Sequence, residues 1–256
     1  MRLVDAHCHL EAEEFQGRLD AVLADGRRAG IARFVTAAVT PEEWPVSLAL
    51  AARHPDVSCV LGVHPWYCRE GDLAQLEGLP EALGKGACGI GECGLDTVTD
   101  RTPFEAQVAV FERQLAIARE MNLPVVLHCR KAHNEMLACF RRAGAPERGG
   151  LVHSFAGSAE VAERFMEHGM VFSLGGILTY RNSAKRNVML RRIYPDAFLL
   201  ETDAPDINPV EARERPNVPA NIVHNLRAAG EILGRPEEEI AETTTRNAAR
   251  LFGFEV

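Results

Sequence analysis

Residues 87–130 contain two short apolar runs that flank one long amphipathic segment. The first run reads "ACGIGECG" (87–94), the second reads "PVVLHCR" (124–130), and "TPFEAQVAVFERQLAIARE" (102–120) lies between them. An apolar residue recurs at every third or fourth position of the middle segment, which predicts a helix over 103–120. These residues are Phe104, Val108, Phe111, Leu115 and Ala118. A strand, a helix and a second strand in this order are typical of a parallel sheet.

The start of this helix carries a capping signal. Thr102 and Glu105, three residues apart, match a capping box, and Pro103 between them suits a first helical position. The sequence therefore predicts that the helix begins at Pro103, directly after Thr102.

The same alternation of short apolar runs and helical periods extends along the whole chain. Strand candidates begin near residues 3, 32, 57, 87, 124, 150, 170 and 197. Eight strands that alternate with helices predict an α/β protein, most economically closed as one (β/α)8 TIM barrel over residues 1–256. An open, doubly wound sheet is the alternative fold.

Composition excludes several classes of protein. No uncharged apolar run approaches the roughly 18 residues that a membrane-spanning helix needs, and the first residues lack the pattern of a signal peptide. Seven cysteines without a C-x-x-C pair argue against a disulfide framework. We therefore expect a cytoplasmic protein with no membrane contact, and no obligate protein partner is evident. The net charge of −8 argues against a protein that coats nucleic acid, although bound cations would reverse the sign inside a pocket.

Residues of metal-binding type recur where the predicted strands end. In "DAHCHL" (5–10), His7 and His9 share one face of a strand because successive side chains alternate. That pair alone fits either a shared metal ion or two polar residues at a strand end. Five more imidazoles and carboxylates follow later strands, at the barrel end where TIM-barrel chemistry occurs. They are His64, Glu92, His128, His153 and Asp203.

Convergence of these groups would be costly without a cation to satisfy them. Four histidines and the two carboxylates would make six ligands, which are too many for one tetrahedral site and suit two divalent ions that share a carboxylate. Imidazole and carboxylate ligands fit magnesium, manganese or zinc. Glu92 lies between the strand-1 pair and the pair His128 and His153 around the barrel, so it is the candidate for the bridge.

The chain resembles the TatD family of metal-dependent deoxyribonucleases, within the amidohydrolase-like TIM barrels. The matching motifs are "DAHCHL" (5–10), "GVHPW" (62–66), "GECGLD" (91–96), "LHCRKA" (127–132), "VHSFAGS" (152–158), "ETDAP" (201–205) and "TTTRNAARLFG" (243–253). The resemblance implies that one ion is held by His7, His9 and Asp203. It implies that His128 and His153 hold the other, that Glu92 bridges them, and that His64 lies beside the substrate phosphate.

Two departures from the family concern substrate contact. The family often has a histidine where this chain has Trp66, and often an R-N-E-P loop where Arg215–Pro219 reads "RPNVP". Neither affects the implied metal ligands.

The resemblance implies 3′→5′ removal of nucleotides from single-stranded DNA ends or short oligonucleotides, with a two-metal activated water as nucleophile. Asp203 is the candidate to orient this water and accept its proton, while His64 and Arg130 could neutralise phosphoryl charge. Aromatic residues in the loops could stack bases, and local arginines could attract the strand. The aromatic candidates are Trp66, Tyr67, Phe155 and Tyr180, and the arginines are Arg130 and Arg181.

Three other functions compete with this one. A different small phosphoester would use the same centre. Barrel hydrolases of C–N bonds often bridge their metals with a carboxylated lysine in strand 4, but Lys85, Lys131 and Lys185 are the only lysines and Glu92 occupies that position. A non-catalytic metal-binding protein would be favoured by a missing ligand, and no ligand is missing.

Overall fold

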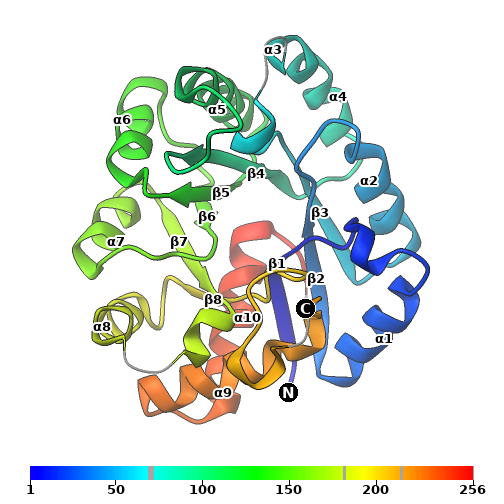
Figure 1. Ribbon diagram of the computed structural model, residues 1–256, viewed down its shortest axis with the longest axis vertical. Coiled ribbons are helices and arrows are strands. Elements are labelled where there is room, and N and C mark those ends of the chain that lie inside the picture. Colours follow the sequence, from blue (N-terminus) through cyan, green and yellow to red (C-terminus); the bar gives the residue numbers. More distant parts are fainter. Residues whose placement is uncertain (69–71, 181–182, 214–215, 256) are drawn as a thin grey trace.

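Eight parallel strands form a ring in the computed structural model, which describes residues 1–68, 72–180, 183–213 and 216–255 (Figure 1). Each strand pairs in parallel with the next one along the chain, from β1 to β8. The strands are β1 (Leu3–Cys8), β2 (Ile31–Ala37), β3 (Val57–Leu61), β4 (Gly89–Asp96), β5 (Val125–Arg130), β6 (Gly150–Val152), β7 (Met170–Leu174) and β8 (Phe198–Leu200). The predicted (β/α)8 barrel is confirmed, and the open sheet is wrong.

Helices surround the ring on its outside, except the last one, which lies behind the ring in this view (Figure 1). They are α1 (Leu19–Arg28), α2 (Trp44–Arg53), α3 (Asp72–Gln75), α4 (Leu79–Leu83), α5 (Phe104–Glu120), α6 (His133–Ala143), α7 (Ala159–Met166), α8 (Ala184–Ile193), α9 (Ile222–Leu233) and α10 (Glu237–Phe252). Within the described part of the chain, none of them is both long and apolar enough to cross a bilayer.

Two apolar layers hold the barrel together. The interior layer includes Val4, Val35 and Val126, and Leu251 and Phe252 of α10 join it from the end where the strands begin. The outer layer lies between strands and helices. It contains the three cysteines that adjoin predicted ligands, namely Cys8, Cys93 and Cys129. They pack there among apolar side chains.

Side-chain and backbone hydrogen bonds connect β1 to the chain that leaves β8. The Asp5 carboxylate accepts the Thr202 backbone N–H at 2.8 Å and the Thr202 hydroxyl at 2.6 Å. One step further, the Asp203 N–H donates to the His7 carbonyl at 2.9 Å. Burial raises the pKa of Asp5 to about 7. These bonds fix Asp203 beside His7.

The predicted capping box at the start of α5 is wrong. The helix begins at Phe104, and Pro103 precedes it without a side-chain cap. The Thr102 hydroxyl instead donates to the Pro65 carbonyl at 2.7 Å and accepts from Gln107 Nε2 at 3.1 Å. Thr102 therefore connects α5 to the loop after β3, because its hydroxyl finds a tertiary partner in place of a local one.

Strand β4 lies close to β5 because its glycines leave room. A Cβ atom on Gly91 would lie 2.5 Å from the Val126 carbonyl oxygen, and one on Gly94 would lie 2.0 Å from that of His128. Both glycines have positive φ angles, 149° and 142°. No other residue fits these two conditions without strain. The glycines on either side of Glu92 thus set its distance from His128.

Gly94→Ala should therefore lower the free energy of unfolding by about 2–4 kcal/mol, since the backbones of β4 and β5 must separate. Urea denaturation followed by circular dichroism measures the change. Gly78→Ala is the matched control, because a Cβ atom there meets nothing within 4 Å. Equal stability of the two variants would contradict a packing role for Gly94.

Candidate metal centre

The six predicted ligands converge inside the barrel, at the end where the strands finish. Glu92 and His128 lie within their strands rather than at the ends, because the pairing of β4 with β5 continues to Asp96 and Arg130. The other four lie where the sequence placed them, at the end of β1 or beyond the ends of β1, β6 and β8. They are His7, His9, His153 and Asp203.

One group of ligand atoms surrounds the point between β1, β4 and the chain after β8. His7 Nε2 lies 3.3 Å from Glu92 Oε2 and 3.4 Å from Asp203 Oδ1. His9 Nε2 lies 3.4 Å and 3.6 Å from the same two oxygens. Atoms that are each about 2.0–2.1 Å from one ion lie about 2.9–3.4 Å apart at right or tetrahedral angles. The spacing of this group suits one divalent ion.

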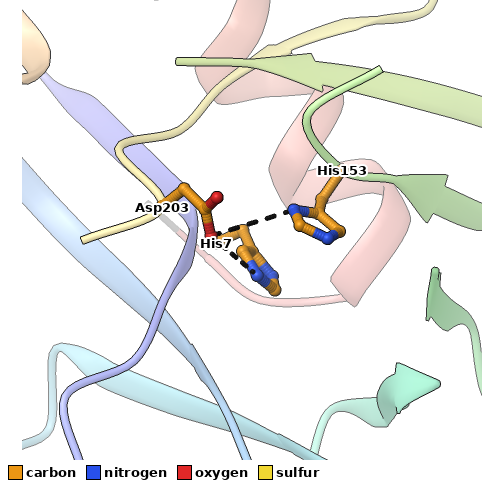
Figure 2. A group of neighbouring side chains, drawn as sticks. All are labelled: His7, His153 and Asp203. Carbon is orange, nitrogen blue, oxygen red and sulfur yellow. Dashed lines mark ion pairs between the residues drawn. The ribbon is translucent and has the colours of Figure 1, made fainter. Parts of the chain in front are cut away.

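A second group uses the other oxygen of the same glutamate. Glu92 Oε1 lies 3.0 Å from His128 Nδ1 and 2.9 Å from His153 Nε2. The two nitrogens are 3.3 Å apart. Figure 2 shows how Asp203 faces the rings of His7 and His153, which brings the two groups side by side. The two oxygens of Glu92 therefore face two different clusters of nitrogen atoms.

Buried ring nitrogens without hydrogen-bond partners also fit a cation. His7 is fully buried, and its Nδ1 has no hydrogen-bond partner among the described residues, while its Nε2 faces only the two carboxylate oxygens at 3.3 and 3.4 Å. His153 Nδ1 likewise has no hydrogen-bond partner there. Such atoms are costly unless they bind something. The donor set, its spacing and these atoms together fit divalent metal.

Electrostatics show how strongly this cluster attracts positive charge. Burial alone would lower the pKa of His9, but hydrogen bonding to Asp203 and the negative charges of Glu92 and Asp203 together outweigh it and raise the pKa to about 9. Burial alone would raise the pKa of Glu92, but the surrounding imidazoles, His153 foremost, hold it well below its usual range. Protons that the carboxylates hold on these rings would be displaced when metal binds.

Hydrogen bonds on the far side of each ring set which nitrogen faces the centre. His9 Nδ1 lies 2.9 Å from the Ala37 carbonyl, which can only accept, so in the neutral ring Nδ1 carries the proton and Nε2 has the lone pair. His128 Nε2 lies 3.3 Å from Asp96 Oδ2, which leaves the lone pair of Nδ1 for the centre. Both rings are oriented as ligands.

His64 is oriented in the opposite way. Its Nδ1 accepts the Trp66 backbone N–H at 3.1 Å, so in the neutral ring Nε2 carries the proton. Nε2 lies 3.2 Å from Glu92 Oε1 and donates to it. Burial lowers the pKa of His64 to about 4, which keeps the ring neutral. His64 therefore directs an N–H rather than a lone pair at the centre.

Two further buried carboxylates, Asp96 and Glu201, hold the ligands in position. The sequence alone assigned neither of them a role. Asp96 Oδ2 accepts from Trp66 Nε1 at 2.7 Å and from the far side of His128. Although burial alone would raise the pKa of Asp96, the hydrogen bonds from His128, Trp66 and the Val98 N–H together hold it below its usual range. Glu201 accepts the Ser154 N–H at 2.8 Å and so fixes the turn after His153. The sequence feature that could have identified Asp96 and Glu201 is their place in the "GECGLD" and "ETDAP" motifs.

The cavity above the centre has a volume of about 270 Å³. Of the predicted substrate contacts, His64, Trp66 and Tyr67 line it. The guanidinium of Arg101 lies 4.6 Å from the centre of the Trp66 ring. Trp66 therefore faces the cavity while its indole N–H is held by Asp96.

The other predicted contacts lie outside this cavity. Arg130 and Tyr180 are exposed and do not line it. The prediction that Phe155 stacks a base is wrong, because its ring is buried and packs 4.5 Å from that of Phe172. Arg181 and the first residue of the loop Arg215–Pro219 lie outside the described residues.

The model of the family described as TatD related DNase matches residues 4–253. The chain belongs to the TatD family. A TatD-family relative from Escherichia coli K12, named uncharacterized metal-dependent hydrolase YjjV, is 33% identical over 98% of each chain. The crystal structure of YjjV, titled a TatD homolog, superposes with a TM-score of 0.92 and covers 99% of both chains at 32% identity. A protein of Erwinia tasmaniensis named 3′-5′ ssDNA/RNA exonuclease TatD is 32% identical, over 98% of this chain and 100% of its own.

Membership of the TatD family makes the protein a metal-dependent hydrolase. The names of the relatives differ in what they specify. The name of YjjV states no substrate, whereas the name of the Erwinia protein states single-stranded DNA and RNA. The prediction of the family and of its reaction class is confirmed.

Proposed function

We propose that the protein is a 3′→5′ exonuclease that removes nucleotides from single-stranded DNA ends or short oligonucleotides. The observation that supports this proposal is the position of Glu92. Its two carboxylate oxygens face two separate groups of imidazole nitrogens. His7, His9 and Asp203 would hold one divalent ion with Glu92, and His128 and His153 the second. The donor set is compatible with magnesium, manganese or zinc.

The residues around this centre divide the chemistry between them. When bound, the two ions supply Lewis acidity toward both the attacking water and the phosphodiester. Asp203 would orient that water and accept its proton, because its carboxylate lies at the edge of the centre, where it also lines the cavity. His64 would direct its Nε2–H at a phosphoryl oxygen and stabilise the charge that develops there.

The shape of the cavity supports action on single strands. Its volume of about 270 Å³ lies near the lower limit of small-molecule sites. A recessed centre of this size admits an unpaired end more easily than a stacked duplex. Trp66 at the cavity wall offers an aromatic ring for an unpaired base beside the scissile phosphate, a contact worth on the order of 1–3 kcal/mol in single-strand binding.

A C–N hydrolase is the weaker candidate. Such barrels often use a carboxylated lysine in strand 4 as the bridge. Here Glu92 occupies that position, and no lysine lies in β4, where all eight residues are described. The chain offers a carboxylate bridge and therefore favours a phosphoester.

Digestion of a 5′-labelled single strand by the metal-reconstituted protein should give a descending ladder of products. A 3′-terminal block should suppress the ladder, because the first nucleotide could no longer enter the centre, and a duplex should react at least about tenfold more slowly. Denaturing electrophoresis measures both effects, with a 5′-blocked strand as the control and an RNA strand of the same sequence as a second substrate. Immediate internal cuts, or equal rates on blocked and free 3′ ends, would contradict the exonuclease proposal and favour a general phosphoesterase.

A further inference from the structure

One side of the cavity is lined with carboxylates that belong to none of the proposed metal ligands. They come from the loops after β8, β1 and β2, and they are Glu11, Glu14, Glu43 and Asp206. Hydrogen bonds hold two of them in place. Glu11 accepts from the hydroxyls of Thr36 and Ser47, and Glu43 accepts the Val39 N–H at 2.7 Å. Glu14 is exposed on the 3-10 helix Glu13–Phe15.

The opposite side of the centre carries exposed cations. Arg101 follows β4, and Arg130 and Lys131 lie at the end of β5. Among the described residues, Arg101 has no carboxylate partner and rests on the face of Trp66. The nearest carboxylate oxygen to Arg130 is that of Asp96, 3.8 Å away, and the arginine side chain is 54% exposed.

The strand order places these two sides across the barrel from each other. In a ring of eight strands, β1 faces β5 and β8 faces β4 (Figure 1). The loops after β8, β1 and β2 therefore stand opposite the loops after β4 and β5. A polyanion in the cavity is repelled on one side of the centre and attracted on the other.

We propose that the nucleic-acid strand leaves the centre over Arg101 and Arg130, and that the acidic side stops it from continuing past the scissile phosphate. This inference rests on the proposed function and gives it a physical cause. A single strand that can extend on one side only must be cut near its end. Arg101, Arg130 and Glu14 thus determine specificity and bind no metal.

The double variant Arg101→Gln/Arg130→Gln tests the cationic path. Its KM for a 12-nucleotide single strand should rise about tenfold, while its KM for a dinucleotide, which extends little beyond the centre, should rise by a smaller factor. The slope of log affinity for the 12-mer against log salt should flatten by about 1.4, since single strands lose about 0.7 per phosphate contact. Arg2→Gln/Arg246→Gln is the control, because it removes the same charge at the opposite end of the barrel.

Glu14→Lys tests the acidic side. Circular single-stranded DNA has no ends, so the wild type should leave it intact, and the variant should cut it at a rate at least about tenfold above background. Glu13→Lys is the matched control, because Glu13 is its exposed neighbour and does not line the cavity.

The outcomes separate this inference from the function on which it rests. A wild type that hydrolyses no DNA overturns both. In another outcome, the wild type degrades linear single strands while the arginine double variant shows the same length and salt dependence as its control. That result overturns the strand path alone. If Glu14→Lys and Glu13→Lys cut circular DNA at the same rate, the proposal that the acidic side stops the strand is wrong.

Discussion

Glu92→Gln should release both metal ions together and lower kcat by about 10³-fold or more. The single carboxylate of Glu92 faces both groups of imidazole nitrogens. An amide of the same shape has one weaker oxygen donor and directs an NH2 at the other group, so neither ion keeps its full set of ligands. Lewis acidity supplies several kcal/mol in such reactions, and about 4 kcal/mol corresponds to the expected loss.

Elemental analysis after reconstitution measures the first effect, and steady-state hydrolysis of a labelled oligonucleotide measures the second. The wild type should hold about two ions per chain. Glu238→Gln is the control, because Glu238 is exposed on α10 and lies with Met1 and Arg2 at the end of the barrel where the strands begin. A variant that kept both ions and full activity would contradict the bridge, and one that lost a single ion would assign Glu92 to one group only.

The barrel could be predicted because its signals are local. Each strand is a short buried run, and a strand buried on both faces is apolar whatever its neighbours are. The start of α5 could not be predicted, because Thr102 and Glu105 satisfy a local rule, while the hydroxyl of Thr102 binds Pro65, 37 residues away. Phe155 illustrates the same limit. Its sequence position places it in a loop, but only the fold shows that its ring packs against Phe172.

The proposed ligands could be found from the sequence because each lies within or just after a predicted strand, and a barrel brings its strands together around one centre. The carboxylates of Asp96 and Glu201 act through other residues, so their roles depend on contacts between distant segments. Glu201 reaches the backbone of Ser154, 47 residues earlier. The same limit applies to the glycines of β4. The sequence shows Gly94, but only the fold shows that Gly94 lies against the His128 carbonyl.

His64→Ala should keep both metal ions and lower kcat by about 10²–10³-fold, the effect of losing one donor to a developing oxyanion. The hydrogen bond from the Trp66 backbone to Nδ1 leaves the proton on Nε2, and a protonated nitrogen cannot bind metal. Elemental analysis and oligonucleotide hydrolysis, measured on the same preparation, test the two parts of this prediction.

His64→Gln separates the N–H from the ring. A glutamine amide can still direct an N–H toward the centre, so it should recover part of the activity that the alanine variant loses, while KM for a dinucleotide stays close to that of the wild type. Loss of metal in the alanine variant would show that Nε2 is a ligand and that the hydrogen bond to Trp66 breaks when metal binds. Full activity with both ions bound would instead remove His64 from the chemistry and leave it a role in packing beside Glu92.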